Sequence, residues 1–92
     1  MMRTSVSSIP DGDWVAGLIR SMVAAIVDTP SAVKVDAIVE GGVTLYRVQV
    51  ANSEIGQVIG KQGRTARSLR TILAAVAMKE KRRIQLDIVS GR

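Results

Sequence analysis

Length, composition and charge limit what this chain can be. Its 92 residues suit one small domain, and 47% hydrophobic with 23% charged residues is the composition of a globular protein. The sequence has no cysteine and no histidine, which excludes a thiol nucleophile, a disulfide framework, a histidine base and the usual zinc ligands. We therefore expect no catalytic residue, metal or cofactor, and we expect the cytoplasm as the compartment.

The basic side chains are concentrated in the second half of the chain. Residues 1–46 hold three basic and five acidic side chains, net −2, whereas residues 47–92 hold ten basic and three acidic ones, net +7. Such a charge favours an anionic partner, either nucleic acid or a membrane surface. A basic surface that only keeps the protein soluble is an equal alternative at this point.

No segment is predicted to insert into a membrane. The most apolar long stretch, residues 14–27, carries Arg20 near its middle. As a helix it would reach only about 21 Å, against about 30 Å of hydrocarbon. Residues 1–12 lack the unbroken apolar run of a secretory signal, so we expect a flexible leader there.

The first predicted element is an amphipathic helix. Apolar residues recur at helical spacing from Trp14 to Ile26, and Asp11 or Asp13 is placed to cap the first turn. Pro30 ends the segment, because proline cannot continue a helix. We expect Trp14 to pack in the core with the other apolar residues of this helix.

Alternation of apolar and polar residues predicts three strands. Two of them, over residues 33–39 and 45–50, flank a turn at Glu40-Gly41-Gly42 and form a hairpin. Tyr46 lies on the apolar side of the second strand, so we expect it in the core rather than stacked on a base. A third strand is predicted over residues 84–89, and residues 90–92 are expected to fray.

Two helices separated by a glycine loop lie between the second and third strands. Asn52 and Ser53 can cap a short helix over residues 54–59, and Gly60 and Gly63 interrupt the chain before a long helix over residues 64–81. The apolar stripe of the long helix that should face the core consists of Ala66, Leu69, Ile72, Leu73 and Val76. Another side of the helix carries Arg64, Arg67, Arg70 and Thr71.

This order, α-β-β-α-α-β, predicts an α+β fold with a three-stranded sheet and three helices on one face. The predicted domain covers residues 13–89.

The glycine loop does not fit a nucleotide site. A Walker motif needs four residues between its first glycine and Gly-Lys-Ser/Thr, whereas only three separate Gly56 from Gly60-Lys61, and Gln62 replaces the hydroxyl residue. What remains is a G-x-x-G turn between two helices. Its glycines let the backbone approach a sugar-phosphate chain closely, and Lys61 and Arg64 favour phosphate. The pattern therefore indicates a clamp for a nucleic-acid backbone.

The stretch Ile55-Gly56-Gln57-Val58-Ile59-Gly60-Lys61-Gln62-Gly63-Arg64, followed by Leu69-Arg70-Thr71, resembles the small single-domain bacterial KH proteins of the KhpA type. The resemblance covers residues 15–89 and implies a type II KH fold that binds single-stranded RNA in a groove beside the loop. The RNA-binding residues implied or expected are the groove-wall residues Val58 and Ile59, the hinges Gly60 and Gly63, the variable pair Lys61 and Gln62, and the cations Arg64, Arg67 and Arg70.

The resemblance also implies partners and a cellular role. Proteins of this type are regarded as RNA chaperones or post-transcriptional regulators that form homodimers or pair with a larger KH/R3H protein, KhpB. They are linked to cell-envelope growth, peptidoglycan homeostasis and cell shape. Our candidate dimer contact lies on the long helix, at Arg70, Thr71, Ala74, Ala75 and Met78, although an ordinary alanine-rich helix face is nearly as good an explanation.

Two other functions compete with RNA binding. A protein-interaction adaptor with little RNA binding of its own would use the same surface, but a simple turn needs no positive charge, which Lys61 and Arg64 supply. An enzyme without histidine or cysteine would need paired carboxylates, and the acidic residues show no such spacing. Single-stranded DNA is a further possible ligand, since nothing in the sequence identifies a reader of the 2′-hydroxyl group.

Overall fold

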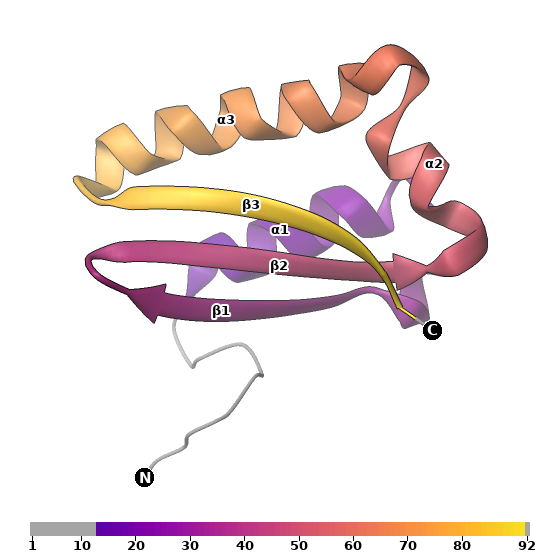
Figure 1. The fold of residues 1–92 in the computed structure, drawn as a ribbon, viewed down its shortest axis with the longest axis horizontal. Coiled ribbons are helices and arrows are strands. Elements are labelled where there is room, and N and C mark those ends of the chain that lie inside the picture. Colours follow the sequence, from indigo (N-terminus) through magenta and orange to yellow (C-terminus); the bar gives the residue numbers. More distant parts are fainter. Residues whose placement is uncertain (1–12, 92) are drawn as a thin grey trace, which may run out of the picture.

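The computed structural model describes residues 13–91, so the predicted leader over residues 1–12 lies outside the described part. The predicted order α-β-β-α-α-β is confirmed (Figure 1). The helices and strands are α1 (Trp14–Ala24), β1 (Lys34–Glu40), β2 (Val43–Ala51), α2 (Ile55–Ile59), α3 (Arg64–Glu80) and β3 (Arg83–Gly91). Single 3-10 turns occur at Pro30–Ala32, Asn52–Glu54 and Lys61–Gly63.

The sheet has the strand order β1-β2-β3, with β2 in the centre. β1 pairs antiparallel with β2 through the predicted hairpin, and β3 pairs parallel with β2, which places Tyr46 opposite Ala37 on one side and Leu86 on the other. Ser90 and Gly91 pair with Val50 and Ala51, so the ordered strand extends past its predicted end at Val89. Because β3 has one neighbour, its other edge is free beside α3.

The helices cover one face of the sheet, which confirms the predicted two-layer α+β arrangement. Figure 1 views the open face, with α1 behind the strands and α3 along the β3 edge. Complete burial of one aliphatic side chain stabilises the fold by about 1.5–3 kcal/mol, so the interlayer core is its main source of stability. That core includes Val15, Ile19, Val23, Val35, Tyr46, Val48, Val50, Val58, Leu69, Leu73 and Leu86.

Two residues predicted in the core lie on the surface. Trp14 is 47% exposed and Ile72 is 44% exposed, so both predictions were wrong. The Trp14 ring packs instead against the ammonium of Lys79, 5.9 Å from the ring centre, a distance typical of a cation–π contact. Ile72 lies at the margin of the apolar stripe of α3, where Leu69 and Leu73 take the positions that face the sheet.

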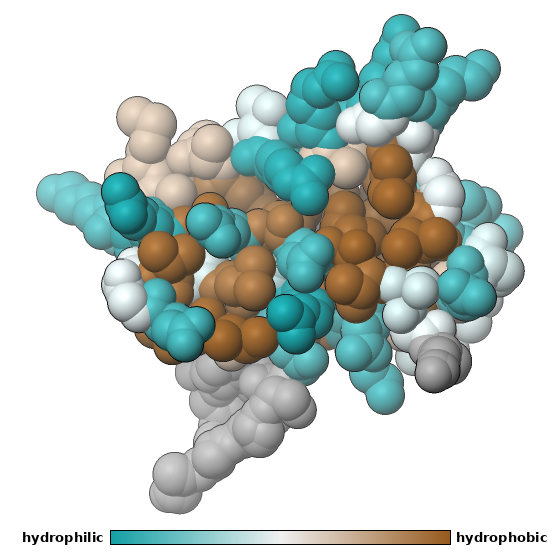
Figure 2. Space-filling view, viewed as in Figure 1, coloured by the Kyte–Doolittle hydropathy of each residue, from teal (hydrophilic) through white to brown (hydrophobic). Residues whose placement is uncertain are grey.

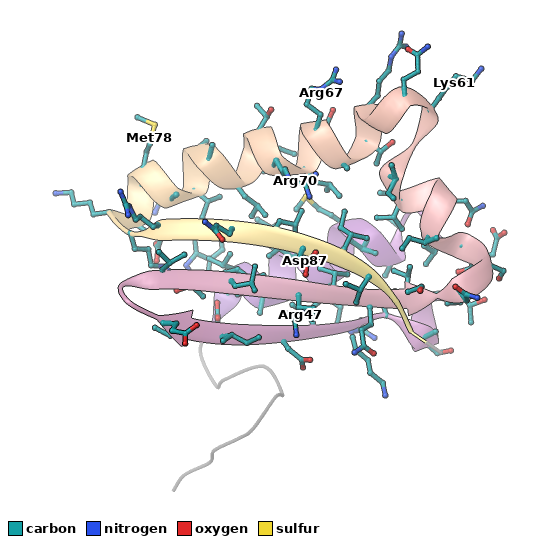
Figure 3. All side chains as sticks on the ribbon, viewed as in Figure 1. Arg47, Lys61, Arg67, Arg70, Met78 and Asp87 are labelled. Carbon is teal, nitrogen blue, oxygen red and sulfur yellow. The ribbon has the colours of Figure 1, made fainter. Side chains whose placement is uncertain are left out.

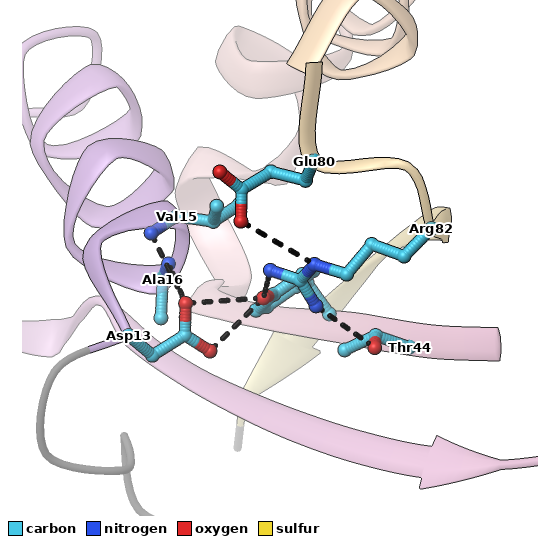
Figure 4. Close-up of polar contacts among 7 residues, drawn as sticks. Asp13, Val15, Ala16, Thr44, Glu80 and Arg82 are labelled. Carbon is cyan, nitrogen blue, oxygen red and sulfur yellow. Dashed lines mark hydrogen bonds and ion pairs between the residues drawn. The ribbon is translucent and has the colours of Figure 1, made fainter. Parts of the chain in front are cut away.

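Asp13 is the cap of α1, and it also ties this helix to the sheet (Figure 4). Its Oδ1 accepts hydrogen bonds from the backbone N–H groups of Val15 and Ala16, at 3.0 and 3.1 Å. The hydroxyl of the fully buried Tyr46 donates to the same carboxylate, 2.9 Å from Oδ2. Burial raises the pKa of the Tyr46 hydroxyl, so this group stays protonated and able to donate.

Arg82, in the turn after α3, completes this polar cluster. Its guanidinium donates to the Tyr46 hydroxyl and to Thr44 Oγ1, both at 3.0 Å. Glu80 lies 3.8 Å from Arg82 Nε. The cluster therefore joins the start of α1, the centre of β2 and the end of α3 with satisfied hydrogen bonds, as buried polar groups require.

Replacing Asp13 tests this connection. Asp13→Ala removes both the helix cap and the acceptor for Tyr46, and we expect it to lower the free energy of unfolding by about 1–3 kcal/mol in urea denaturation. Asp13→Asn keeps an acceptor oxygen for the cap and should retain much of that stability. An unchanged denaturation midpoint for Asp13→Ala would show that the cluster does not stabilise the fold.

Candidate nucleic-acid interface

The loop between α2 and α3 depends on two glycines for different reasons. Gly60 has φ 82° and ψ 169°, a conformation that is essentially restricted to glycine. A Cβ atom there would also lie 2.8 Å from Thr65 Cβ and 2.9 Å from its backbone nitrogen. Gly63 is left-handed, with φ 73° and ψ 15°, but a Cβ there would enter open space. Gly60 therefore brings the loop and the start of α3 closer together than any side chain allows.

The loop presents its polar groups to solvent. Lys61, Gln62 and Arg64 are exposed, and Figure 3 shows Lys61 pointing away from the body of the protein. The 17-residue helix α3 starts at Arg64 without a side-chain cap. The Arg64 N–H donates to the Lys61 carbonyl oxygen, so the backbone N–H groups that follow it are the ones that can donate to a ligand, and the helix dipole favours an anion at this end.

The arginines of α3 turn in two directions, although the sequence placed them on one side. Arg67 is exposed and points away from the sheet in Figure 3. Arg70 turns toward the free edge of β3, where its Nη2 donates to the Leu86 carbonyl oxygen at 3.3 Å. The loop and the outer side of α3 thus form a cationic rim, while Arg70, which is also exposed, reaches from α3 to the edge of β3.

A groove runs beside the loop between α3 and β3. Its first hollow has a volume of about 420 Å³ and its second about 340 Å³, and Arg70 lines both. Figure 2 shows apolar surface on this face of the molecule, interrupted by hydrophilic side chains. The first hollow is lined by Ile59, Gly63, Ala66, Arg67, Arg70, Asp87 and Ile88, and the second by Arg70, Leu73, Ala74, Ile84, Gln85 and Leu86.

One predicted groove residue is misplaced, and several were missed. Val58 is fully buried, so its side chain lies behind the groove wall, whereas Ile59 is 40% exposed and lines the groove. Sequence reasoning missed the lining residues of β3, among them Asp87 and Ile88. The alternation of β3 gives the face of each residue, but not that β3 is the edge strand beside α3. The Asp87 carboxylate pairs with Arg47 Nε at 3.5 Å.

The candidate dimer contact forms a strip along α3, and Ala74 of this strip also lines the second hollow of the groove. Met78 is 80% exposed, and Ala74 and Ala75 are exposed as well. The Thr71 hydroxyl donates to the Arg67 carbonyl oxygen at 3.0 Å. Figure 3 places Met78 near the far end of α3 from the loop, so the strip starts beside the cationic rim and leads away from it.

Two other kinds of site find no support between residues 13 and 91. None of the helices there has both the length and the apolar character to cross a membrane. Nor do three or more acidic side chains gather there in an arrangement that could hold a metal ion.

A three-stranded α+β sheet with a G-x-x-G turn between two helices, opening onto a groove at the sheet edge, defines a KH domain. Residues 16–88 match the family described as KhpA/KhpB, KH domain, and the chain belongs to this family. The predicted family membership and KH fold are thereby confirmed.

Curated relatives of similar length resemble this chain in sequence. The protein named RNA-binding protein KhpA from Caldanaerobacter subterraneus is 40% identical over 72 residues, which are 78% of this chain and 96% of that relative. Proteins of the same name from Halalkalibacterium halodurans and Borreliella burgdorferi are 42% and 40% identical, again over 78% of this chain and over 95% and 88% of theirs. The names of these relatives describe RNA-binding proteins and state no enzymatic activity.

A solved structure shows the same fold within a larger protein. The crystal structure of an Era variant from Aquifex aeolicus, bound to GDP and aluminium tetrafluoride, superposes with a TM-score of 0.62 at 14% identity. The match covers 90% of this chain and 32% of that one. At this identity the likeness concerns the fold alone.

The two loop glycines should respond differently to alanine. Gly60→Ala introduces both a forbidden backbone conformation and the clash with Thr65, and we expect a loss of about 2–4 kcal/mol of unfolding free energy. Gly63→Ala meets only the left-handed penalty, about 1–2 kcal/mol. Thermal denaturation of both variants checks the order, and equal losses would contradict the role assigned to Gly60.

Proposed function

We propose that this protein binds single-stranded RNA with the loop Gly60–Gly63 and the adjoining groove between α3 and β3. The observation that supports this most strongly is the exposed cationic loop, shaped by glycine, at the mouth of a partly apolar groove. The relatives named RNA-binding protein KhpA support the same ligand class. The site therefore combines contacts for the RNA backbone with a surface for its bases.

The phosphates bind along the rim. Gly60 and Gly63 have no side chain to keep the strand away, and Lys61 and Arg64 place two cations at the start of α3, where the N–H groups after Arg64 can donate to phosphate. A KH groove holds about four nucleotides. If Lys61, Arg64 and Arg67 each neutralise one phosphate, the logarithm of affinity falls with the logarithm of salt with a slope of about −2. One domain alone thus binds weakly.

The bases enter the groove without aromatic stacking. The sequence has only two aromatic residues, and neither of them lines the groove hollows beside the loop, because Tyr46 is buried and Trp14 packs against Lys79. Ile59 and Ile88 offer aliphatic surface to the base faces instead. Contacts of this kind discriminate little between bases, which suits an RNA chaperone or post-transcriptional regulator acting on many RNAs in the cytoplasm. The link to cell-envelope growth and cell shape stays a prediction from the family resemblance.

A second copy, or a larger KH/R3H protein of the KhpB type, contacts the strip of α3 that contains Thr71, Ala74, Ala75 and Met78. The exposed Met78 supports this, since a flexible apolar side chain on a small-residue surface suits a protein contact. Pairing places two loops on one RNA and raises the affinity through effective concentration. Arg70 faces the groove in the structure, and its share in the dimer contact stays a prediction.

Reversing the charge of the loop tests RNA binding. Lys61→Asp with Gln62→Asp places two carboxylates where phosphate should bind, and we expect affinity for an unstructured RNA to fall at least about tenfold in fluorescence anisotropy. Both residues are exposed, so the melting temperature should change little.

The matched control is Arg20→Asp with Ser21→Asp, which changes two exposed neighbours on α1 by the same net charge. It should keep most of the RNA affinity, because α1 lies on the covered face of the sheet, away from the loop. Equal losses in both double variants would show that binding depends on net charge alone. Unchanged binding in the loop variant would contradict the proposed function.

An acidic substitution tests the protein contact. Met78→Glu should shift the protein toward monomer in sedimentation velocity, because burying an unpaired carboxylate in an apolar contact costs several kcal/mol. Val39→Glu is the control, since Val39 is a similarly exposed aliphatic residue on β1, 72% exposed. If Met78→Glu leaves the sedimenting mass unchanged, both for the protein alone and with the KhpB-type partner present, the proposal that this strip is a protein contact is contradicted.

A further inference from the structure

Arg70 occupies a position that the other cations of the site do not share. It lies at the junction of the two groove hollows, and its Nη2 donates to the Leu86 carbonyl oxygen at 3.3 Å. That carbonyl belongs to the free edge of β3 and points away from β2. Arg67 lines only the first hollow and points away from the sheet, and Lys61 lines neither hollow (Figure 3). Arg70 is exposed like them, but it is the one cation among residues 13–91 that lines both hollows and reaches the β3 edge.

The guanidinium of Arg70 has unused hydrogen-bonding capacity. A guanidinium carries five N–H donors in a planar fork. Among residues 13–91, Leu86 provides its only hydrogen-bond acceptor, and no carboxylate pairs with it. The bond is also longer than the usual 2.9–3.0 Å of an N–H···O bond. The remaining donors are free to bind a ligand in the hollows that Arg70 lines.

The surroundings of Arg70 favour a base over a phosphate. Asp87 lines the same hollow as Arg67 and Arg70, and its carboxylate, which pairs with Arg47 at 3.5 Å, makes this hollow less positive than the loop rim. Ile59 and Ile88 add aliphatic surface that suits the face of a base but offers a phosphate no hydrogen bond. A strand held at the rim by its phosphates would thus turn the edge of a base toward Arg70.

We propose that Arg70 selects one nucleobase of the bound strand by donating two parallel hydrogen bonds to two neighbouring acceptors on its edge. This rests on the proposed binding of single-stranded RNA. Guanine offers such a pair in O6 and N7, and cytosine offers one in N3 and O2. Adenine and uracil have no two adjacent acceptors, since a donor or a C–H group separates theirs. The groove therefore prefers a strand with guanine or cytosine at one position.

The test measures base preference separately from affinity. RNAs of about eight nucleotides, twice the length one groove holds, are made as all-uracil and with a single central adenine, cytosine or guanine. Fluorescence anisotropy with the wild-type protein should give about tenfold tighter binding for the cytosine or the guanine strand than for the uracil and adenine strands. The strand that binds more tightly identifies the base.

Two conservative variants separate base selection from the effect of positive charge. Arg70→Lys keeps the charge and loses the planar fork, so it should bind the four strands with equal affinity. Arg67→Lys makes the same change on the rim and should keep the preference.

A wild-type protein that binds RNA without preference, or an Arg70→Lys variant that keeps it, would overturn the inference while leaving RNA binding intact. A wild-type protein that binds none of the strands would overturn the proposed function as well.

Discussion

The parallel pairing of β3 with β2 determines where the functional surface lies. Two parallel strands cannot be joined by a tight turn, so the chain must cross from one end of the sheet to the other. Here the crossover consists of α2, the glycine loop and α3, and it returns the chain to the edge of the sheet rather than to its centre. The loop and the free edge of β3 therefore face the same groove.

Glycine allows a short loop to join the two helices of this crossover. Gly60 takes a conformation that other residues avoid, and it lies against Thr65 without room for a Cβ atom. The same geometry leaves a bare backbone beside the open end of α3 and the side chains of Lys61 and Arg64. The feature that lets the two helices meet is thus also the feature that lets a phosphate chain approach.

The cations of the site lie in two places, at the loop rim and at the β3 edge. Lys61, Arg64 and Arg67 form the rim, while Arg70, which is exposed too, reaches the β3 edge and shares a hollow with the carboxylate of Asp87. A surface of this kind attracts an anionic strand over a long range and yet gives its phosphates and its bases different positions. Because few phosphates are contacted, weak binding by one domain and stronger binding by a pair of domains follow from the same arrangement.

Local patterns in the sequence predicted most of the fold. An aspartate cap on the first helix, the hairpin at Gly41-Gly42 and the buried Tyr46 depend on residues close in sequence or on simple alternation. The structure confirms all three, and it places the cap at Asp13 of the two candidates Asp11 and Asp13. Family resemblance added the loop as a binding element. The order of the elements, with turns between them, was enough to predict the two layers.

The sequence predictions failed where tertiary packing, rather than a local pattern, determines which side chains are exposed. Trp14 and Ile72 fit the apolar periodicity of their helices, but each lies at the margin of its stripe and stays exposed. Val58 precedes the loop and yet points into the core. The groove residues on β3 could not be predicted from the sequence, because no local pattern shows which strand is the edge or that Arg70 turns toward Leu86.

The most direct test of this account is a map of RNA contacts by ¹⁵N-edited NMR of the protein titrated with a short unstructured RNA. We predict that amide shifts change together at Gly60 to Arg67 and at Leu86 to Ile88, the two sides of the groove. Shift changes on β1, around Ile38, with the loop and β3 edge unaffected, would contradict it.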